Sequence, residues 1–361
     1  MNQTKQEILK QEILSLCGTM SVSGFETREA ARLREKFAPH FDEVTTDAVG
    51  NHVFVKRCGK ENAPLVMVDA HFDEIGMMVT QVCEGGFLKF TSVGGLSLPV
   101  LQAADVTVYG TETLRGVITS IPPHLRANRD DESLADLSEL MIDTGYPEEE
   151  LRLIAPPGTP VGFAPHYTEL LGGQLAGKSF DNKACAAIAA VAVTETPKEK
   201  LAADVALVFS CYEETSRLGG IAPVCFNLNP DYAMVIDVNL ATVPNVPKCE
   251  TVPLGKGISL AVSAATDRAL TKAAQELCVA REIPHTMVAA PCSTGTNATT
   301  VNLVKNGIPV VDVGLPLKSM HTYNEVISLI DAESLCRLVE AFITSEDIAQ
   351  QFQRRGEEVP T

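Results

Sequence analysis

Short apolar runs separated by polar, glycine-containing segments recur along the chain, and four of them end close to a histidine or a carboxylate. These four runs span residues 65–70, 205–211, 232–236 and 308–313. Runs of this length that are rich in Val, Ile and Leu are typical of strands buried on both faces of a parallel sheet. Because ligands gather outside the carboxyl ends of such strands, we expect the polar residues near the ends of the runs to meet at one edge of a sheet.

Apolar residues at helical spacing lie between the predicted strands. The clearest stripe is formed by Leu9, Ile13 and Leu16, which predicts an amphipathic helix near the N-terminus. Further helices are expected over residues 26–37, 182–194, 267–281 and 331–345. This alternation of strand and helix predicts an α/β fold with a mostly parallel sheet.

The pattern changes between Glu84 and about Pro165, where short strands are separated by glycines. One helix, over residues 131–144, is expected among them. A block of short strands inside such a chain predicts an inserted β-rich domain, and a length of 361 residues also favours two domains. We expect the insert to span residues 73–165 and to divide the other domain into residues 1–72 and 166–361.

The charge of the chain excludes some classes of partner. Lys and Arg total 29 against 46 Asp and Glu, which gives a net charge of −17. Binding to nucleic acid or to an anionic membrane depends on basic residues, so neither is expected as a partner. The mean hydropathy of +0.09 is typical of a well-packed globular enzyme.

The chain shows no signal for export or membrane insertion. Charged residues interrupt the N-terminal segment, and the longest apolar run, 184–193, is shorter than the ~20 residues needed to cross a bilayer. The ten cysteines are scattered and form no C-x-x-C pair, which favours reduced thiols over a disulfide framework. We therefore expect a cytoplasmic protein.

The polar residues near the strand ends have the chemistry of metal ligands. The candidates are His71, Asp181, Glu214, Asp237 and His321. Imidazole and carboxylate ligands without a thiolate suit Zn²⁺, Co²⁺ or Mn²⁺. Five such ligands exceed the three that one catalytic metal usually takes, but they supply two metals if one carboxylate bridges. Two metals roughly 3.5–4 Å apart are a recurrent arrangement in aminopeptidases.

Each candidate also has an ordinary interpretation. His71 alone is more often a core histidine, and Asp181 alone is a common helix cap. The adjacent pair Glu213 and Glu214 is also compatible with a solvated helix start, where the helix dipole favours negative charge. The combination of all these residues near strand ends favours the metal site. Asp73, two residues after His71 in an extended segment, points the same way and is placed to orient the His71 ring.

The chain resembles the tetrahedral, or glutamyl, aminopeptidase family of two-metal exopeptidases over about residues 13–343. The order of Asp, Glu-Glu, Asp and His along the chain is a specific part of this resemblance. The motifs that carry the resemblance are VSGFE (22–26), GN (50–51), AHFDEIGMMV (70–79), SVGG (92–95), IPPHL (121–125), GKSFDNKA (177–184), EE and GG (213–214, 219–220), ID (236–237), LGKG (254–257) and MH with EV (320–326).

The resemblance implies roles for the matching residues. One metal would be held by His71, Asp181 and Asp237, and the other by Asp181, Glu214 and His321. Glu213 would be the general base, and Asp73 would orient His71. The implied fold is a three-layer α/β/α zinc-peptidase-like domain with an inserted β-barrel, PDZ-like dimerisation domain. The implied assembly is a homo-oligomer, commonly a dodecamer built from dimers.

Several positions depart from the usual family pattern. Lys183 stands where Arg is usual, Cys185 where Gly is usual and Asn297 where Asp is usual. Leu96 replaces a common aromatic residue, and Ser216 stands where Gly is usual. None of these positions is an expected metal ligand or the base, so we expect them to affect specificity.

These features predict a metal-dependent aminopeptidase that hydrolyses N-terminal residues from short peptides. Two divalent ions per subunit are expected, with zinc as the first choice and cobalt or manganese as alternatives. A di-metal deacylase acting on N-acyl amino acids or small amides is the alternative. A glycosidase ranks third. It would use paired carboxylates, but it needs no histidine ligands, so His71 and His321 would have no role. An inactive shell or binding protein is disfavoured, because every expected ligand is present.

Overall fold

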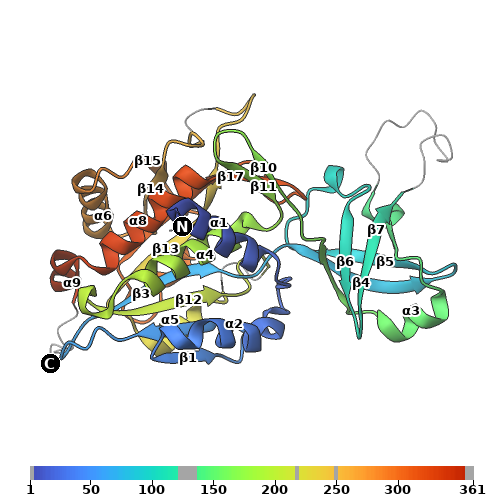
Figure 1. The fold of residues 1–361 in the computed structure, drawn as a ribbon, viewed down its shortest axis with the longest axis horizontal. Helices are drawn as coiled ribbons and strands as arrows, with labels where there is room; N and C mark the ends of the chain where they lie inside the picture. Colours follow the sequence, from blue (N-terminus) through green and yellow to red (C-terminus); the bar gives the residue numbers. More distant parts are fainter. Residues whose placement is uncertain (1–3, 121–135, 216–218, 248–250, 354–361) are drawn as a thin grey trace.

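The computed structural model describes residues 4–120, 136–215, 219–247 and 251–353. Its largest element is an eight-stranded sheet that runs through the middle of one lobe, with a smaller β-rich lobe at its side (Figure 1). Across the sheet the strands are β1 (Glu43–Thr46), β2 (His52–Lys56), β12 (Asp204–Ser210), β3 (Leu65–His71), β13 (Tyr232–Leu240), β16 (Val310–Leu317), β14 (Ile258–Ser263) and β15 (His285–Ala290).

The centre of this sheet is parallel, as the apolar runs predict. Strands β12, β3, β13 and β16 pair in parallel, and β14 pairs in parallel with β15. The β1–β2, β2–β12 and β14–β16 pairs are antiparallel. The central strands are buried on both faces, which explains why their sequences are continuously apolar. Their carboxyl ends therefore lie at one edge of the sheet.

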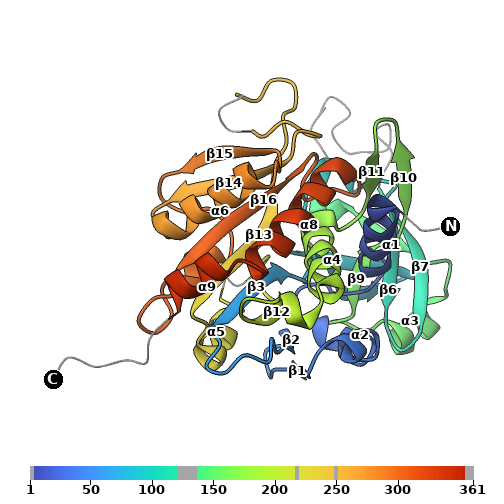
Figure 2. The same ribbon diagram turned by 60° about the vertical axis from the view of Figure 1, so that its left-hand side comes forward.

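Helices cover both faces of the sheet and form the predicted three layers (Figure 2). One face packs against α1 (Lys5–Cys17), α4 (Phe180–Glu195), α6 (Arg268–Ala280) and α8 (Leu329–Ile343). The other face packs against the shorter α5 (Ala222–Leu228) and α7 (Ala298–Val301). Three predicted helices therefore agree with α4, α6 and α8 to within about two residues at each end. None of the helices described has the length and apolar character needed to traverse a bilayer.

The predicted helix over 26–37 is only partly α-helical. Its first turn, Glu26–Glu29, is a 3₁₀ helix, and α2 (Ala30–Phe37) follows. Leu33 and Phe37 face the core from α2, where Phe37 makes an edge contact with Phe54.

The smaller lobe is a closed six-stranded barrel. Its strands, in order around the barrel, are β4 (Gly76–Cys83), β5 (Phe87–Val93), β8 (Met141–Asp143), β7 (Thr113–Thr119), β6 (Asp105–Tyr109) and β9 (Pro160–Phe163). The barrel has its own apolar core, and α3 (Glu148–Ile154) packs on it through Leu151 and Ile154. All of its strands lie within the range 73–165 expected for the insert, whose exact limits stay a prediction.

The prediction of a helix over residues 131–144 is wrong for residues 136–144, which the structure describes. Residues 137–139 form a short 3₁₀ turn, and Met141–Asp143 form strand β8. Ile142 is fully buried between β5 and β7, so tertiary pairing outweighs the local helical spacing of the leucines. Residues 131–135 and the IPPHL motif lie outside the described residues.

A three-stranded sheet connects the barrel to the main lobe. It contains β10 (Tyr167–Leu170), β11 (Gln174–Gly177) and β17 (Glu325–Ser328), with β11 in the middle. Strand β11 leads directly into the segment that opens α4, and β17 leads into α8. This small sheet therefore places the start of α4 beside the loop that follows β16.

Phe209, in β12, lies at the centre of an aromatic cluster on the face of the sheet that α1, α4, α6 and α8 cover. Its ring is fully buried and lies 5.1 Å from Phe54 and 5.7 Å from both Phe37 and Phe72. We expect Phe209→Ala to lower the free energy of unfolding by about 3–5 kcal/mol, because the substitution leaves a cavity. The measurement is urea unfolding followed by circular dichroism at fixed protein concentration. The matched control is Phe226→Ala, because the Phe226 side chain is 60% exposed and its loss should cost less than about 1 kcal/mol.

Candidate metal centre

The predicted site residues come together at the carboxyl edge of the central strands. His71 is the last residue of β3, and Glu213 and Glu214 follow the end of β12. Asp181 lies in the first turn of α4, before its regular helical geometry begins. Asp237 lies within β13, which is separated from β12 by β3. Strand β13 is longer than predicted: it continues past residue 236 and pairs with β16 as far as Leu240. His321 lies in the loop between β16 and β17.

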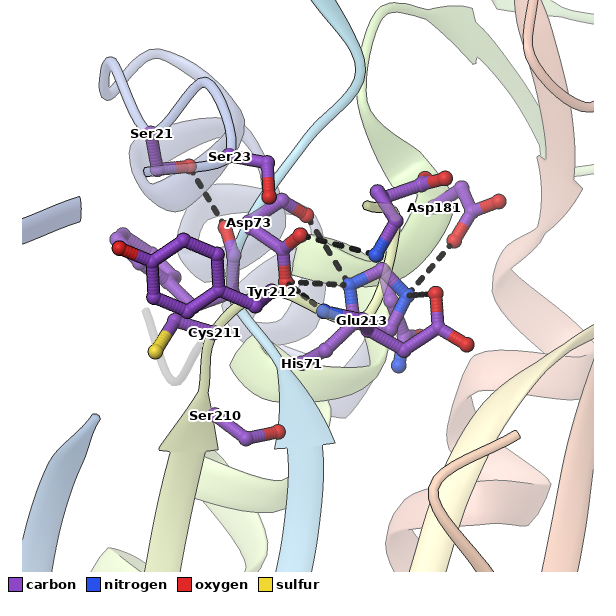
Figure 3. Close-up of polar contacts among 12 residues, drawn as sticks. Ser21, Ser23, His71, Asp73, Asp181, Ser210, Cys211, Tyr212 and Glu213 are labelled. Atoms are coloured by element: carbon purple, nitrogen blue, oxygen red, sulfur yellow. Dashed lines mark hydrogen bonds and ion pairs between the residues drawn. The ribbon is translucent and has the colours of Figure 1, made fainter. Parts of the chain in front are cut away.

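The His71 ring is surrounded by carboxylates. Figure 3 shows the ring between Asp73 on one side and Asp181 and Glu213 on the other. Its Nε2 atom lies 3.2 Å from Asp181 Oδ1, 3.6 Å from Asp237 Oδ1 and 3.8 Å from Glu213 Oε2. Its Nδ1 atom lies 3.0 Å from the Asp73 carbonyl oxygen and 3.4 Å from Asp73 Oδ1. If that nitrogen carries the proton, Nε2 is free to bind a cation.

Asp181 directs its two oxygens at different histidines. Its Oδ1 faces His71, while its Oδ2 lies 3.5 Å from His321 Nε2. The same His321 nitrogen lies 3.3 Å from Glu214 Oε2. A carboxylate with one oxygen on each side has the geometry of a bridging ligand between two cations.

The donor atoms fit the group that the sequence predicts. In three sets of residues, one donor atom per residue lies within 4.8 Å of the others. These sets are His71–Asp181–Asp237, Asp181–Glu214–His321 and His71–Glu213–Glu214. Glu214 Oε1 is buried and, among the described residues, has no hydrogen-bond partner. Burying an unpaired carboxylate oxygen is costly, so a cation at this position would satisfy it.

The charges in this cluster shift its pKa values strongly. Burial raises the pKa of Glu213 to about 9. Burial opposes protonation of His71, but nearby carboxylates, Asp237 foremost, hold its pKa well above the ordinary value. Hydrogen bonds, first to Asp181, raise the pKa of His321 to about 11. Carboxylates outnumber the positive charges here, so the cluster retains protons that a bound divalent cation would displace.

Asp73 holds the turn that carries the acidic pair. Its Oδ1 accepts the backbone N–H of Glu213 at 3.2 Å, and its Oδ2 accepts that of Glu214 at 3.1 Å. Tyr212, just before them, has a left-handed backbone with φ of 58°. Asp73 therefore contacts both the His71 ring and the turn bearing the expected base. The first contact was expected from spacing, whereas the second was not.

Two buried acids next to the cluster have no role predicted from the sequence. Glu26, in the VSGFE motif, is 1% exposed and accepts the Tyr212 N–H at 3.4 Å. Glu325, in the MH with EV motif, is 2% exposed and contacts the backbone of Asp181 and His321. A carboxylate in a buried strand such as Glu325–Ser328 is itself a signal, because burial requires it to have partners.

Behind the cluster, one carboxylate holds two buried lysines. Glu74 lies 2.7 Å from Lys178 Nζ and 3.0 Å from Lys183 Nζ, and all three side chains are at most 2% exposed. Glu74 also accepts the hydroxyl of Ser179 and the backbone N–H of Ser21. This group therefore fixes the segment 177–181 against the segment 18–24.

The departures from the family pattern fall on supporting positions where the structure describes them. Lys183 belongs to the Glu74 group, and Cys185 is fully buried in α4. Asn297 is buried and donates to Asp69 Oδ2 at 3.0 Å and to Ser210 Oγ at 2.9 Å. Leu96 packs against the barrel core, and Ser216 lies outside the described residues.

Comparison with known proteins gives consistent matches. A family model described as M42 glutamyl aminopeptidase matches residues 50–338. The chain is 30% identical over 307 residues to a lysyl aminopeptidase of Pyrococcus furiosus, covering 84% of this chain and 87% of that protein. It is 29% identical over 351 residues to the putative aminopeptidase FrvX of Escherichia coli, covering 94% and 95%.

Solved structures have the same fold. An aminopeptidase from the archaeon Desulfurococcus kamchatkensis is 26% identical, with a TM-score of 0.88, covering 99% of this chain and 100% of that one. The TET1 peptidase of Pyrococcus horikoshii, described as assembling into a tetrahedron or a large octahedral shell, is 25% identical with a TM-score of 0.81. That match covers 93% of this chain and 99% of that one.

The Glu74 group generates a prediction about stability and pH. Burial alone would raise the pKa of Glu74, but Lys178 and Lys183 outweigh it and lower the pKa to about 2. Because the folded pKa is depressed, the stabilisation is complete above about pH 4.5 and is lost as the pH falls towards 2. We expect Glu74→Gln to cost about 3–5 kcal/mol at pH 7, since it leaves two ammonium groups buried without their anion.

The measurement is urea unfolding of metal-stripped protein at several pH values. The difference between wild type and Glu74→Gln should shrink as the pH falls from 4.5 towards 2. Glu276→Gln is the control, because Glu276 pairs with Lys272 on the surface, where both side chains are at least 66% exposed. Equal stability of wild type and Glu74→Gln at pH 7 would contradict the assigned role.

Proposed function

The chain belongs to the M42 glutamyl aminopeptidase family, and from this premise we propose that Glu213 is the general base with which it removes N-terminal residues from short peptides. Membership makes it a metal-dependent aminopeptidase, a hydrolase of peptide bonds. The single observation that carries the site assignment is Asp181, whose two oxygens face two different histidines.

The proposed ligands form two sets that share Asp181. His71, Asp181 and Asp237 would hold one cation, and Asp181, Glu214 and His321 the other. Nitrogen and oxygen donors without a thiolate favour zinc, with cobalt or manganese as alternatives. When bound, the two cations would acidify a water molecule and polarise the scissile carbonyl.

We propose that Glu213 moves the proton of that reaction. Its Oε2 lies 3.8 Å from His71 Nε2, at the margin of the ligand cluster, and its backbone is held by Asp73. Glu213 would take a proton from the attacking water and return it to the nitrogen of the leaving amine. The free α-amine of the substrate would be held by a cation or a carboxylate at the site, which restricts cleavage to N-termini.

The assembly we propose is a homo-oligomer, with a dodecamer built from dimers as the favoured form and the insert 73–165 as the dimerisation domain. The relative that assembles into a tetrahedron or an octahedral shell supports an oligomer. The β10–β11 hairpin also exposes Tyr167, Leu170 and Leu171, the last of them 96% exposed. A cytoplasmic location is proposed from the nine described cysteines, all of which are free.

A substrate panel tests the proposed reaction. Aminoacyl, N-acyl-amino-acid and glycoside chromogenic substrates are each assayed with and without chelator. We expect turnover of the aminoacyl substrates only, its loss on chelation and its recovery with Zn²⁺, Co²⁺ or Mn²⁺. Preferential turnover of the N-acyl substrates would instead indicate the deacylase, and activity that survives complete metal removal would contradict the metal mechanism.

The role of Glu213 is tested by Glu213→Gln, which keeps the size of the side chain and removes its basicity. Metal content should stay at the wild-type value, while kcat should fall by about 10²–10⁴-fold. Metal analysis and kinetics on the same preparation make the measurement, with the surface variant Glu276→Gln as control. Normal kcat in Glu213→Gln would remove the assignment of the base.

A further inference from the structure

Glu325 lies between two segments that carry ligands of the proposed metal pair. It is the first residue of β17, only four residues after His321. The antiparallel register of β11 and β17 places it opposite Gly177, which precedes Asp181 by four residues. Its side chain is only 2% exposed.

Both carboxylate oxygens of Glu325 accept backbone N–H groups, one from each segment. Oε2 accepts the N–H of Asp181 at 3.0 Å, and Oε1 accepts the N–H of His321 at 3.2 Å. These two amides belong to the two residues whose side chains face each other in the cluster, with Asp181 Oδ2 3.5 Å from His321 Nε2. One carboxylate thus fixes the separation of two ligands that are distant in the sequence.

Both segments need such a contact, because their backbones are locally unfavourable. His321 has a left-handed φ of 61°, and Ser179, two residues before Asp181, has a φ of 57°. A left-handed conformation costs a residue with a side chain roughly 1–2 kcal/mol. A hydrogen bond from a backbone amide contributes about 0.5–1.5 kcal/mol, which offsets much of that cost at His321.

We propose that Glu325 is a positioning residue for the metal pair, which sets the distance and orientation of Asp181 relative to His321. This inference rests on the proposed ligand sets. Loss of Glu325 should affect the two ion sites unequally, because Glu325 holds two of the three ligands of the Asp181–Glu214–His321 set. In the His71–Asp181–Asp237 set it holds only Asp181.

The chain offers a matched control for a purely structural role. Asp331, in α8, is fully buried and also uses both oxygens to accept backbone N–H groups, from Gly255 and Gly257 at 2.6 Å each. It holds the LGKG segment and contacts none of the proposed ligands. Asp331→Asn should therefore lower stability without changing metal binding.

The test compares Glu325→Gln with Asp331→Asn in the full-length, metal-stripped protein. An amide side chain has one acceptor oxygen, so at least one of the two N–H groups held by Glu325 loses its partner. Calorimetric titration with Zn²⁺ should show one ion bound by Glu325→Gln within about threefold of the wild-type affinity and the second at least tenfold more weakly. Asp331→Asn should keep both affinities while its melting temperature falls.

Kinetics supply a second readout that a structural defect would not change. Activity of Glu325→Gln should recover as Zn²⁺ is raised, with KM near the wild-type value, because the weakened ion is refilled. If Glu325→Gln does not fold, Glu325→Asp serves instead, since its shorter side chain cannot reach both amides.

Wild-type affinity for both ions in the folded variant would overturn the proposal, and so would activity that excess Zn²⁺ does not restore. A wild-type protein that binds fewer than two ions would instead overturn the proposed ligand sets. That result is independent of any variant, so the two failures are distinguishable.

Discussion

The arrangement of the site depends on buried carboxylates that accept backbone N–H groups. Asp73 holds the turn of Glu213 and Glu214, and Glu325 holds Asp181 and His321. These residues come from segments far apart in the chain, and several segments adopt left-handed backbone conformations. Each of these hydrogen bonds contributes about 0.5–1.5 kcal/mol, so together they offset the local strain. The side chains facing the cluster are then held before any ligand arrives, which lowers the entropic cost of binding.

Much of the fold could be predicted from local patterns. The central strands are buried on both faces, so their apolar runs identify them. Helices α6 and α8 have apolar residues at helical spacing after the capping residues Asp267 and Ser328, and α4 is an alanine-rich run. The segment 137–143 could not be predicted in this way. Its leucines suggest a helix, but Ile142 is placed in the barrel wall by partners in β5 and β7, and such pairing is not visible in a local window.

The candidate site likewise has residues that could be predicted from the sequence and supporting contacts that could not. His71, Glu213 and Asp237 could be selected because each lies at or near the end of a predicted strand, and the structure brings them together with Asp181, Glu214 and His321. The contacts of Glu325 could not be predicted, because they depend on the register of β11 against β17. The amide contacts of Asp73 depend in turn on the left-handed residue Tyr212. The residue type at the end of a strand can be read from a short stretch of sequence. The buried carboxylates that bind the backbone of the ligand residues are determined only by tertiary pairing.

The barrel begins and ends on neighbouring strands, because β4 pairs with β9 through Met77 and Val161. The chain thus departs just beyond His71 and returns ahead of Asp181 through two points that lie side by side. For a segment closed in this way, each doubling of a loop's length costs only about 0.6 kcal/mol of closure entropy. A loop of the barrel can therefore lengthen at little cost in free energy without separating the two points that lead to His71 and Asp181.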